Sequence, residues 1–169
     1  MDSIFAQAAY AEDQTNAHSI LYLHVMRASA MSFTFLSLVQ FPFDAARARY
    51  QQTPADLTTL LTRTFRSSGR AFVIGTAAGA LATWGRMRGM AEVEWQDRAW
   101  RILNNKGEMQ TDWTTAGGLG AGAVVGVAAA RRGALALSTG NAILGGAGVG
   151  SSIGIPFMIS TFARGRKPA

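Results

Sequence analysis

The chain has 169 residues, of which 49% are hydrophobic and only 15% are charged, well below the roughly 25% charged residues of ordinary soluble domains. It contains no cysteine, which excludes disulfides and thiolate metal ligands. The formal net charge is +6, but the basic residues border long charge-free stretches. This arrangement indicates contacts with anionic lipid head groups and not with nucleic acid.

Long stretches without any charged residue divide the sequence. A membrane-spanning helix needs about 20 mostly apolar residues, a length that the third and fourth stretches reach by themselves. The first stretch is extended backwards past Arg27, and the second borrows from Arg70, Arg86 and Arg88, whose aliphatic stems can reach the interface. The four stretches are residues 28–43, 71–85, 113–130 and 133–163.

These stretches predict an all-α, polytopic membrane protein with about four transmembrane helices. The alternative is a soluble helical protein with buried helices, but such helices rarely run this long without a charge. We divide the chain into a polar N-terminal tail (1–17), a membrane domain (18–163) and a basic C-terminal tail (164–169). The predicted spans lie near residues 20–42, 70–88, 113–131 and 136–160.

The N-terminal tail is mildly acidic and carries no targeting signal that would be cleaved. Residues 1–26 contain Asp2, Glu12 and Asp13 but no lysine or arginine. A secretory signal needs a basic start, and a mitochondrial presequence is rich in arginine and poor in acids. We therefore expect any organellar address to be internal. The first span then ends at Pro42, which is a natural helix stop.

The segment after the first span predicts a short amphipathic surface helix over residues 54–66. Thr53, Pro54 and Asp56 form a helix start that resembles a capping box. Leu57, Leu61 and Phe65 then share one face, and the arginines lie away from it. Such a helix lies on a membrane surface or docks on a protein subunit, and the sequence leaves both open.

The second span contains Gly75 and Gly79, four residues apart. We interpret residues 86–112, between the second and third spans, as a loop whose five basic and five acidic residues give a net charge of zero. Two tryptophans lie in this loop and one at each neighbouring span end, so all four are predicted at one membrane interface, the level that indole rings favour. They are Trp84, Trp95, Trp100 and Trp113.

Glycine gives the most informative pattern. Twelve of the 19 glycines lie between residues 117 and 154, and they form two ladders with a spacing of four. Residues four apart share a helix face, and glycine lets two backbones approach each other. We expect the third and fourth spans to pack as a close antiparallel pair. The ladders are Gly118, Gly122 and Gly126, and Gly146, Gly150 and Gly154.

Catalytic, cofactor and metal sites are not predicted. The glycines match no nucleotide-binding fingerprint, since no third glycine, acidic residue or lysine follows at the required spacing. His18 and His24 are six residues apart, so they do not share a helix face. The ordinary interpretation is a histidine near an interface, and metal binding is not expected.

Arg27 is the most informative single residue, because it would lie about 10 Å inside the bilayer if the first span begins at Ile20. A charged residue at that depth needs a partner, and no acidic residue lies within a predicted span. We expect backbone carbonyls, lipid phosphate, water or another subunit to be that partner, unless the span begins later and Arg27 only reaches the interface. The residues predicted to bind lipid or partners are Arg27, Arg63, Arg66, Arg70, Arg131 and Arg132.

Four spans, glycine ladders and the tight basic turn at residues 131–133 resemble the mitochondrial inner-membrane import-translocase family, which includes an accessory subunit of respiratory complex I. The chain also resembles the small fungal accessory membrane subunits of complex I. The resemblance implies a multi-pass protein of the mitochondrial inner membrane without an active site. It would support assembly and stability of complex I, with other membrane subunits and an anionic phospholipid such as cardiolipin as partners. A translocase or channel component is the alternative.

Overall fold

The computed structural model describes residues 4–51 and 56–164, apart from the side chains of Asp44 and Phe162. Within these ranges the chain is helical and has no strand, which confirms the all-α class. The elements are η1 (Ala11–Asp13), α1 (Ala17–Leu38), α2 (Gln40–Tyr50), α3 (Leu57–Met87), α4 (Glu92–Asn104), α5 (Lys106–Arg131), α6 (Thr139–Ser151) and α7 (Gly154–Ala163).

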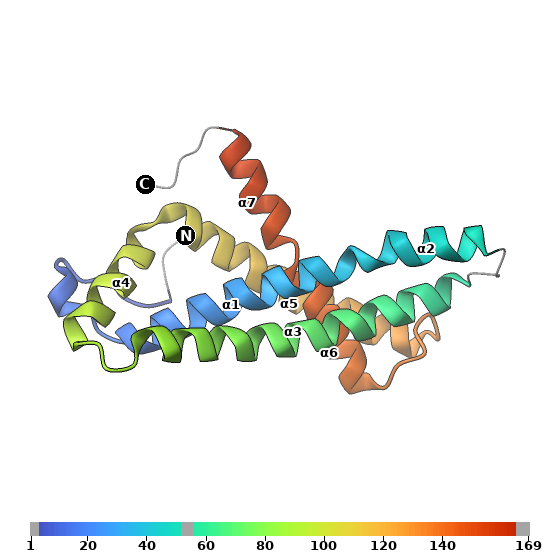
Figure 1. Ribbon diagram of the computed structural model, residues 1–169, viewed down its shortest axis with the longest axis horizontal. Helices are drawn as coiled ribbons and strands as arrows, with labels where there is room; N and C mark the ends of the chain where they lie inside the picture. Colours follow the sequence, from blue (N-terminus) through green and yellow to red (C-terminus); the bar gives the residue numbers. More distant parts are fainter. Residues whose placement is uncertain (1–3, 52–55, 165–169) are drawn as a thin grey trace.

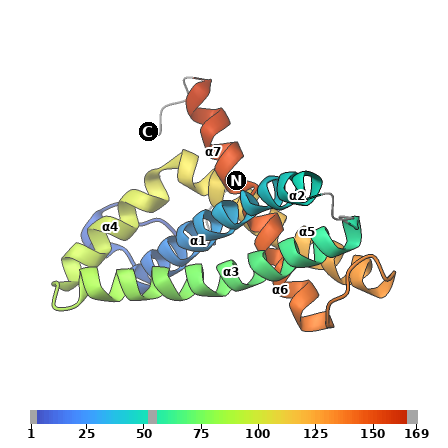
Figure 2. The same cartoon turned by 45° about the vertical axis from the view of Figure 1, so that its right-hand side comes forward.

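Two antiparallel helix pairs form the centre of the molecule (Figures 1 and 2). One pair is α1 with α3, and the other is α5 with α6. The pairs meet where α6 packs on α3. We call these four helices the body. At one end α4 and the N-terminal residues cover the body, and we call residues 4–22 and 87–109 the α4 end.

Proline does not stop the first helix where the sequence predicts it. The helix is interrupted at Val39 and continues as α2 to Tyr50. A proline ring clashes with the carbonyl four residues earlier, which for Pro42 belongs to Leu38, the last residue of α1. Pro42 is the third residue of α2, where its missing N–H costs little, so the chain bends and goes on.

The predicted surface helix is not a separate element. Residues 57–66 are the first turns of α3, which runs without a break to Met87. Asp56 is the N-cap and accepts a hydrogen bond from the N–H of Thr58, while Thr53 and Pro54 lie outside the described residues. The interpretation of Leu57–Phe65 as a helix lying apart from the second span was therefore wrong.

The region predicted as a loop holds the amphipathic helix instead. Residues 92–104 form α4, and α5 begins at Lys106, seven residues before the predicted span. Trp95, Ala99 and Leu103 recur every four residues along α4 and are all buried. The side chain of Asn105 starts α5 by accepting hydrogen bonds from the N–H groups of Gly107 and Glu108.

The fourth predicted span is helical but interrupted at Ser152 and Ile153, where α6 ends and α7 begins (Figure 1). Pro156 explains the interruption, since its ring clashes with the carbonyl of Ser152. The Ser152 hydroxyl adds to the distortion by donating to the carbonyl of Val149 at 2.6 Å.

Two helical stretches are long and apolar enough to cross a membrane. They are Lys106–Arg131 and Thr139–Thr161, with mean hydropathies of 1.3 and 1.6. Among the described residues α1 and α3 do not reach the same standard, so only two of the four predicted spans satisfy it. The reason is visible in the sequence: α1 carries His24 and Arg27, and the apolar part of α3 is short.

The interior of the body is lined by glycine and by hydroxyl groups. Thr34, Ser68 and Ser151 are no more than 1% exposed. Hydroxyl pairs link the helices: Thr34 Oγ1 lies 3.2 Å from Ser151 Oγ between α1 and α6, and Ser37 Oγ lies 3.0 Å from Ser68 Oγ between α1 and α3. Each hydroxyl also donates to a carbonyl of its own helix or shares its proton with the partner, so these buried groups are satisfied.

The outer surface of the body carries the large apolar side chains. Val124 of α5 is 70% exposed, and Leu81 of α3 is 67% exposed. Leu36, Ile74 and Val125 are exposed to a similar degree. Small residues lie inside and large apolar residues outside, which reverses the distribution of a protein that folds in water.

The α4 end has the opposite character. Trp95 and Leu103 of α4 pack with Ile20 and Met87 in a buried apolar cluster. The Trp95 ring stacks on His18 with centroids 3.9 Å apart. This is an ordinary hydrophobic core covered by one amphipathic helix.

The N-terminal segment belongs to the α4 end and is not a free tail. Gln14 is buried, and its amide donates to the carbonyls of Ala6 and Thr15. Its side-chain oxygen accepts from the N–H of Ala8. Trp100 Nε1 of α4 donates to the carbonyl of Ala8 at 3.0 Å. Hydrogen bonds thus hold the predicted polar tail against α4 from residue 6 onward.

Candidate functional site

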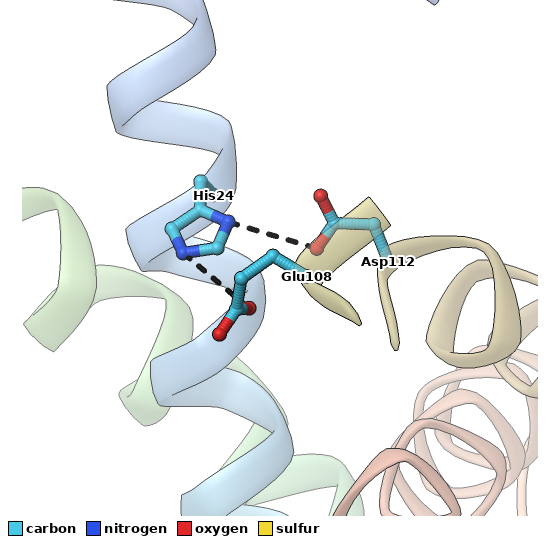
Figure 3. Close-up of side chains that lie close together, drawn as sticks. All are labelled: His24, Glu108 and Asp112. Atoms are coloured by element: carbon cyan, nitrogen blue, oxygen red, sulfur yellow. Dashed lines mark ion pairs between the residues drawn. The ribbon is translucent and has the colours of Figure 1, made fainter. Parts of the chain in front are cut away.

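An ion cluster joins α1 to α5 beside the α4 end. Arg27 donates from one terminal nitrogen toward Asp112, toward Glu108 Oε2 at 3.3 Å, and toward His24 Nδ1 at 3.2 Å. His24 lies between the two carboxylates, 3.8 Å from Glu108 and 3.7 Å from Asp112 (Figure 3). Arg27 and His24 are largely buried, and about a third of each carboxylate side chain is exposed. We call these four residues the ion cluster.

Helix spacing brings these side chains together. His24 and Arg27 are three residues apart on α1, and Glu108 and Asp112 are four apart on α5, so each pair shares a helix face. The early start of α5 places both carboxylates on a helix, whereas the sequence analysis left them in a loop. The two faces are opposed because α4 turns the chain back over the start of α1 (Figure 1).

The prediction that Arg27 finds no acidic partner in its own chain was wrong. Its carboxylate partners lie 81 and 85 positions further along the sequence. Sequence spacing does not show such a contact, because it depends on how α1 and α5 pack. Nor was it foreseen that both histidines lie beside acids, His18 being 2.8 Å from Glu92 on the exposed side of α4.

His24, Glu108 and Asp112 also have the geometry of a possible cation site. One ligand atom from each lies within 4.8 Å of the others. Arg27 already places a terminal nitrogen within ion-pair or hydrogen-bond distance of all three, however. A metal ion would need the space and the charge that the guanidinium supplies. The donor set therefore fits an internal arginine better than a metal.

An apolar cavity of about 260 Å³ adjoins the ion cluster. Its walls come from the N-terminal segment, α1, α4 and α5, with Phe5, Leu23 and Trp113 among the lining residues. His24, Arg27 and Asp112 form its polar side. The ion cluster thus borders an apolar space on one side, while its carboxylates remain partly exposed.

The structure brings the two glycine ladders into backbone contact. A Cβ added to Gly118, Gly122 or Gly126 would overlap a carbonyl oxygen of α6. The facing residues are Gly150, Gly146 and Ala142 respectively, which is an antiparallel register. Gly154 does not continue this register; a Cβ there would overlap the side chains of Met31 and Thr115.

Gly75 and Gly79 pack in the same manner on α1. A Cβ on Gly75 would lie 2.8 Å from Ala30 Cα, and one on Gly79 would lie 2.7 Å from Met26 Cα. The sequence analysis singled out these glycines without naming the helix they face. Their spacing predicts a close contact, but only the fold identifies α1 as the partner.

A second glycine face on α6 was missed. Gly145 packs against the backbone of Phe65, and Gly148 against that of Ser68, both on α3. Gly69 of α3 completes this contact from the other side, facing Gly145. Gly145 and Gly148 are three residues apart and therefore also share a helix face. The sequence thus indicated this second glycine face as well as the more regular ladder.

The remaining predicted arginines are exposed and separate into two groups. Arg66 and Arg70 line a groove between α3 and α6, whereas Arg63, Arg131 and Arg132 are exposed outside it. In the part of the chain that the structure describes, none of the five forms an ion pair with an acidic residue. Arg27 therefore differs from them, because its charge is neutralised internally.

Comparison with known proteins identifies one family and no characterised relative. The family model described as "Protein of unknown function (DUF1757)" matches residues 12–145, which is most of the chain. The match begins in η1 and ends in the middle of α6, so it includes the ion cluster and α4. No curated protein matches the chain.

Proposed function

We propose that this chain, which belongs to the DUF1757 family of proteins of unknown function, is a non-catalytic helical subunit of a large membrane complex. The observation that carries the proposal is the reversed distribution of side chains in the body. Hydroxyls and glycines fill its interior, and Val124, Leu81 and Leu36 point outward.

Physical chemistry connects this distribution with a bilayer. In water, large apolar side chains on the outside would cost about 25 cal/mol for each Å² of apolar surface left exposed. In lipid they cost nothing, and helices associate through close backbone contact and interhelical hydrogen bonds instead. The glycine ladders and the hydroxyl pair of Thr34 and Ser151 supply both.

The ionised groups of the body support a structural role. Arg27 pairs with Glu108 and Asp112 on another helix of the same chain, so the ion cluster holds α1 and α5 in register. Its net charge is low, and the guanidinium occupies the centre where a substrate or metal would have to bind. A fixed internal pair of this kind specifies one arrangement of helices more than it adds stability.

We assign the chain to the mitochondrial inner membrane, as an accessory subunit of respiratory complex I. The support is the resemblance of the glycine ladders and the basic turn before the last helix to accessory subunits of that complex. In this assignment the outward apolar faces of α3 and α5 contact lipid or neighbouring subunits. The subunit would act in assembly, stability and lipid organisation.

Native gel electrophoresis of detergent-solubilised membranes, with mass spectrometry of the band that contains this chain, tests the assignment directly. We expect the chain to migrate with complex I and to resist extraction at alkaline pH. Deleting it should lower the amount of complex, while the turnover of each remaining intact complex stays close to normal. A complex that assembles fully without this chain but is inactive would contradict the non-catalytic role.

A translocase or channel component is the second candidate, and the ion cluster is the observation that favours it. Transport proteins carry ionisable groups among their helices, and His24 lies between Glu108 and Asp112 in such an arrangement (Figure 3). Passage of protons or polypeptide through liposomes that contain only the purified chain would support this candidate. Loss of that passage in Asp112→Asn would assign it to the ion cluster.

A further inference from the structure

A groove of about 540 Å³ runs between α3 and α6 on the outer surface of the body. Arg66 and Arg70 of α3 and Asn141 of α6 form its polar part. Val73, Ile74 and Leu144 form its apolar part. The two parts are arranged along α3, so the groove changes from cationic to apolar within about two helical turns, or roughly 11 Å.

The two arginines have no acidic partner among the side chains that the structure describes. They are four residues apart and therefore neighbours on one face of α3, where like charges repel. No ion pair to either is present among residues 4–51 and 56–164. Both side chains are exposed toward the groove. An anion that accepts from both guanidinium groups would relieve this repulsion.

The surrounding charge adds to the attraction for anions. Residues 44–51, 56–70 and 131–132 contain seven arginines and only two acids. These segments lie together at the end of the molecule away from α4 (Figures 1 and 2). In the groove at this end, two arginines adjoin an apolar wall between helices.

We infer that the groove between α3 and α6 binds one anionic phospholipid. Arg66, Arg70 and Asn141 hold the phosphate, and an acyl chain follows Val73, Ile74 and Leu144. Guanidinium groups bind phosphate oxygens through paired hydrogen bonds, which makes arginine a better choice than lysine here. This inference rests on the proposed membrane location and makes it specific, because it names the lipid contact of the complex.

The close approach of α6 to α3 shapes the groove. Gly69 and Gly145 leave no room for side chains between the two backbones, so the helices touch at the floor of the groove. Arg66 precedes Gly69 by three residues and Val73 follows it by four, and both side chains line the groove. A larger residue at Gly145 would overlap the backbone of Phe65 and separate the two helices, so it would change the shape of the groove.

Native mass spectrometry of the full-length chain in a neutral detergent tests the inference. The probes are short-chain phosphatidylglycerol, phosphatidylcholine of the same chain length, and inorganic phosphate. We expect retained phosphatidylglycerol, little phosphatidylcholine and no retained phosphate. The double substitution Arg66→Gln/Arg70→Gln should weaken phosphatidylglycerol binding by about thirtyfold, because each arginine next to an anionic head group adds to the attraction for the lipid.

Arg131→Gln/Arg132→Gln is the matched control, because it removes the same charge outside the groove. We expect its binding to change by less than about threefold. Leu144→Trp keeps every charge but fills the apolar part, and it should also weaken binding. Melting curves without lipid should coincide for all variants, since these side chains are exposed.

Three results would overturn the inference: equal losses in the two arginine pairs, equal retention of the two lipids, or retention of inorganic phosphate alone. Alkaline extraction of the wild-type chain from its native membrane separates this test from that of the proposed function. A chain that is released by alkali contradicts the membrane location itself. A chain that stays embedded but binds both lipids equally contradicts only the groove.

Discussion

The body and the α4 end of this chain are held together by different interactions. In the body, α5 and α6 touch through glycine backbones, and hydroxyl pairs such as Thr34 and Ser151 link the helices. At the α4 end, Trp95 and Leu103 are buried in a conventional apolar core. This is the difference expected if lipid surrounds the body, as proposed above, and water surrounds the α4 end. Burying apolar groups stabilises a fold where water is the alternative, which is the arrangement found at the α4 end.

The ion cluster lies where the two regions meet. Arg27 belongs to a helix of the body, whereas Glu108 precedes the most apolar part of α5. Asp112 and Arg131 are 19 positions apart, and a helix of that length is roughly as long as a bilayer core is thick. The cluster thus lies at the boundary between the two regions, and four substitutions distinguish them.

Gly122→Leu should have the largest effect. A side chain there would overlap the backbone of Gly146, which cannot move aside as a side chain can. We expect α5 and α6 to separate, and the free energy of unfolding in detergent to fall by about 4 kcal/mol, above the usual range for overpacking. Gly120→Leu is the control, because a Cβ at Gly120 meets nothing within 4 Å. Equal melting temperatures for the two variants would refute backbone contact as the basis of the body.

Trp95→Ala should have the second largest effect. Removing a large side chain from a hydrophobic core should lower the free energy of unfolding by about 3 kcal/mol. The effect should be confined to the α4 end, so hydrogen exchange should speed up in residues 92–104 and not in α6. Trp84→Ala removes an exposed tryptophan and should cost little. If exchange rose equally in α6, the two regions would be a single cooperative unit.

Arg27→Gln should lower the free energy of unfolding by about 2 kcal/mol. This is less than the loss expected on breaking a fully buried ion pair, because the carboxylates are partly exposed. It leaves Glu108 and Asp112 facing each other without a cation. Adding Asp112→Asn should recover much of the loss, and thermal melting of the two single variants and the double variant measures the coupling. Additive losses would mean that Arg27 does not act through Asp112.

Thr34→Val should have the smallest effect, about 0.6 kcal/mol, the average for a hydrogen bond between membrane helices. It removes the link from α1 to Ser151 while keeping the shape of the side chain. Thr114→Val is a fair control, since Thr114 donates only to the carbonyl of Gln110 in its own helix. Denaturation curves in mixed micelles resolve a difference of this size only when the variants are measured side by side. Both variants are therefore compared with the wild-type chain in the same experiment.

The parts of this structure that the sequence predicted are those set by local spacing. Gly118, Gly122 and Gly126 share a face whatever the rest of the chain does, because the helical repeat is fixed. The predicted helix start had Thr53 as its cap, whereas the N-cap in the structure is Asp56, and the helix continues much further than residue 66. The all-α fold class and the glycine faces can therefore be predicted from residue spacing alone.

The ion cluster could not be predicted in this way. Its two halves are more than 80 residues apart, and they meet only because α4 folds back over the start of α1. The helix α4 itself was predictable, since Trp95, Ala99 and Leu103 recur every four residues between acids in the first turn and Arg101 in the last. The segment was predicted as a loop because it lies between two expected spans, and its apolar spacing was not considered.

The two glycine faces of α6 have a consequence for how the chain is completed during synthesis. Helix α5 makes its contacts chiefly with α6, whereas α3 packs on both α1 and α6 and hardly on α5. Until Gly145–Gly150 have been synthesised, α5 is joined to the first helix pair only at the α4 end, through α4 and the ion cluster. A nascent chain that ends before α6 therefore leaves the glycine faces of both α3 and α5 uncovered. Synthesis of α6 covers the two faces at once.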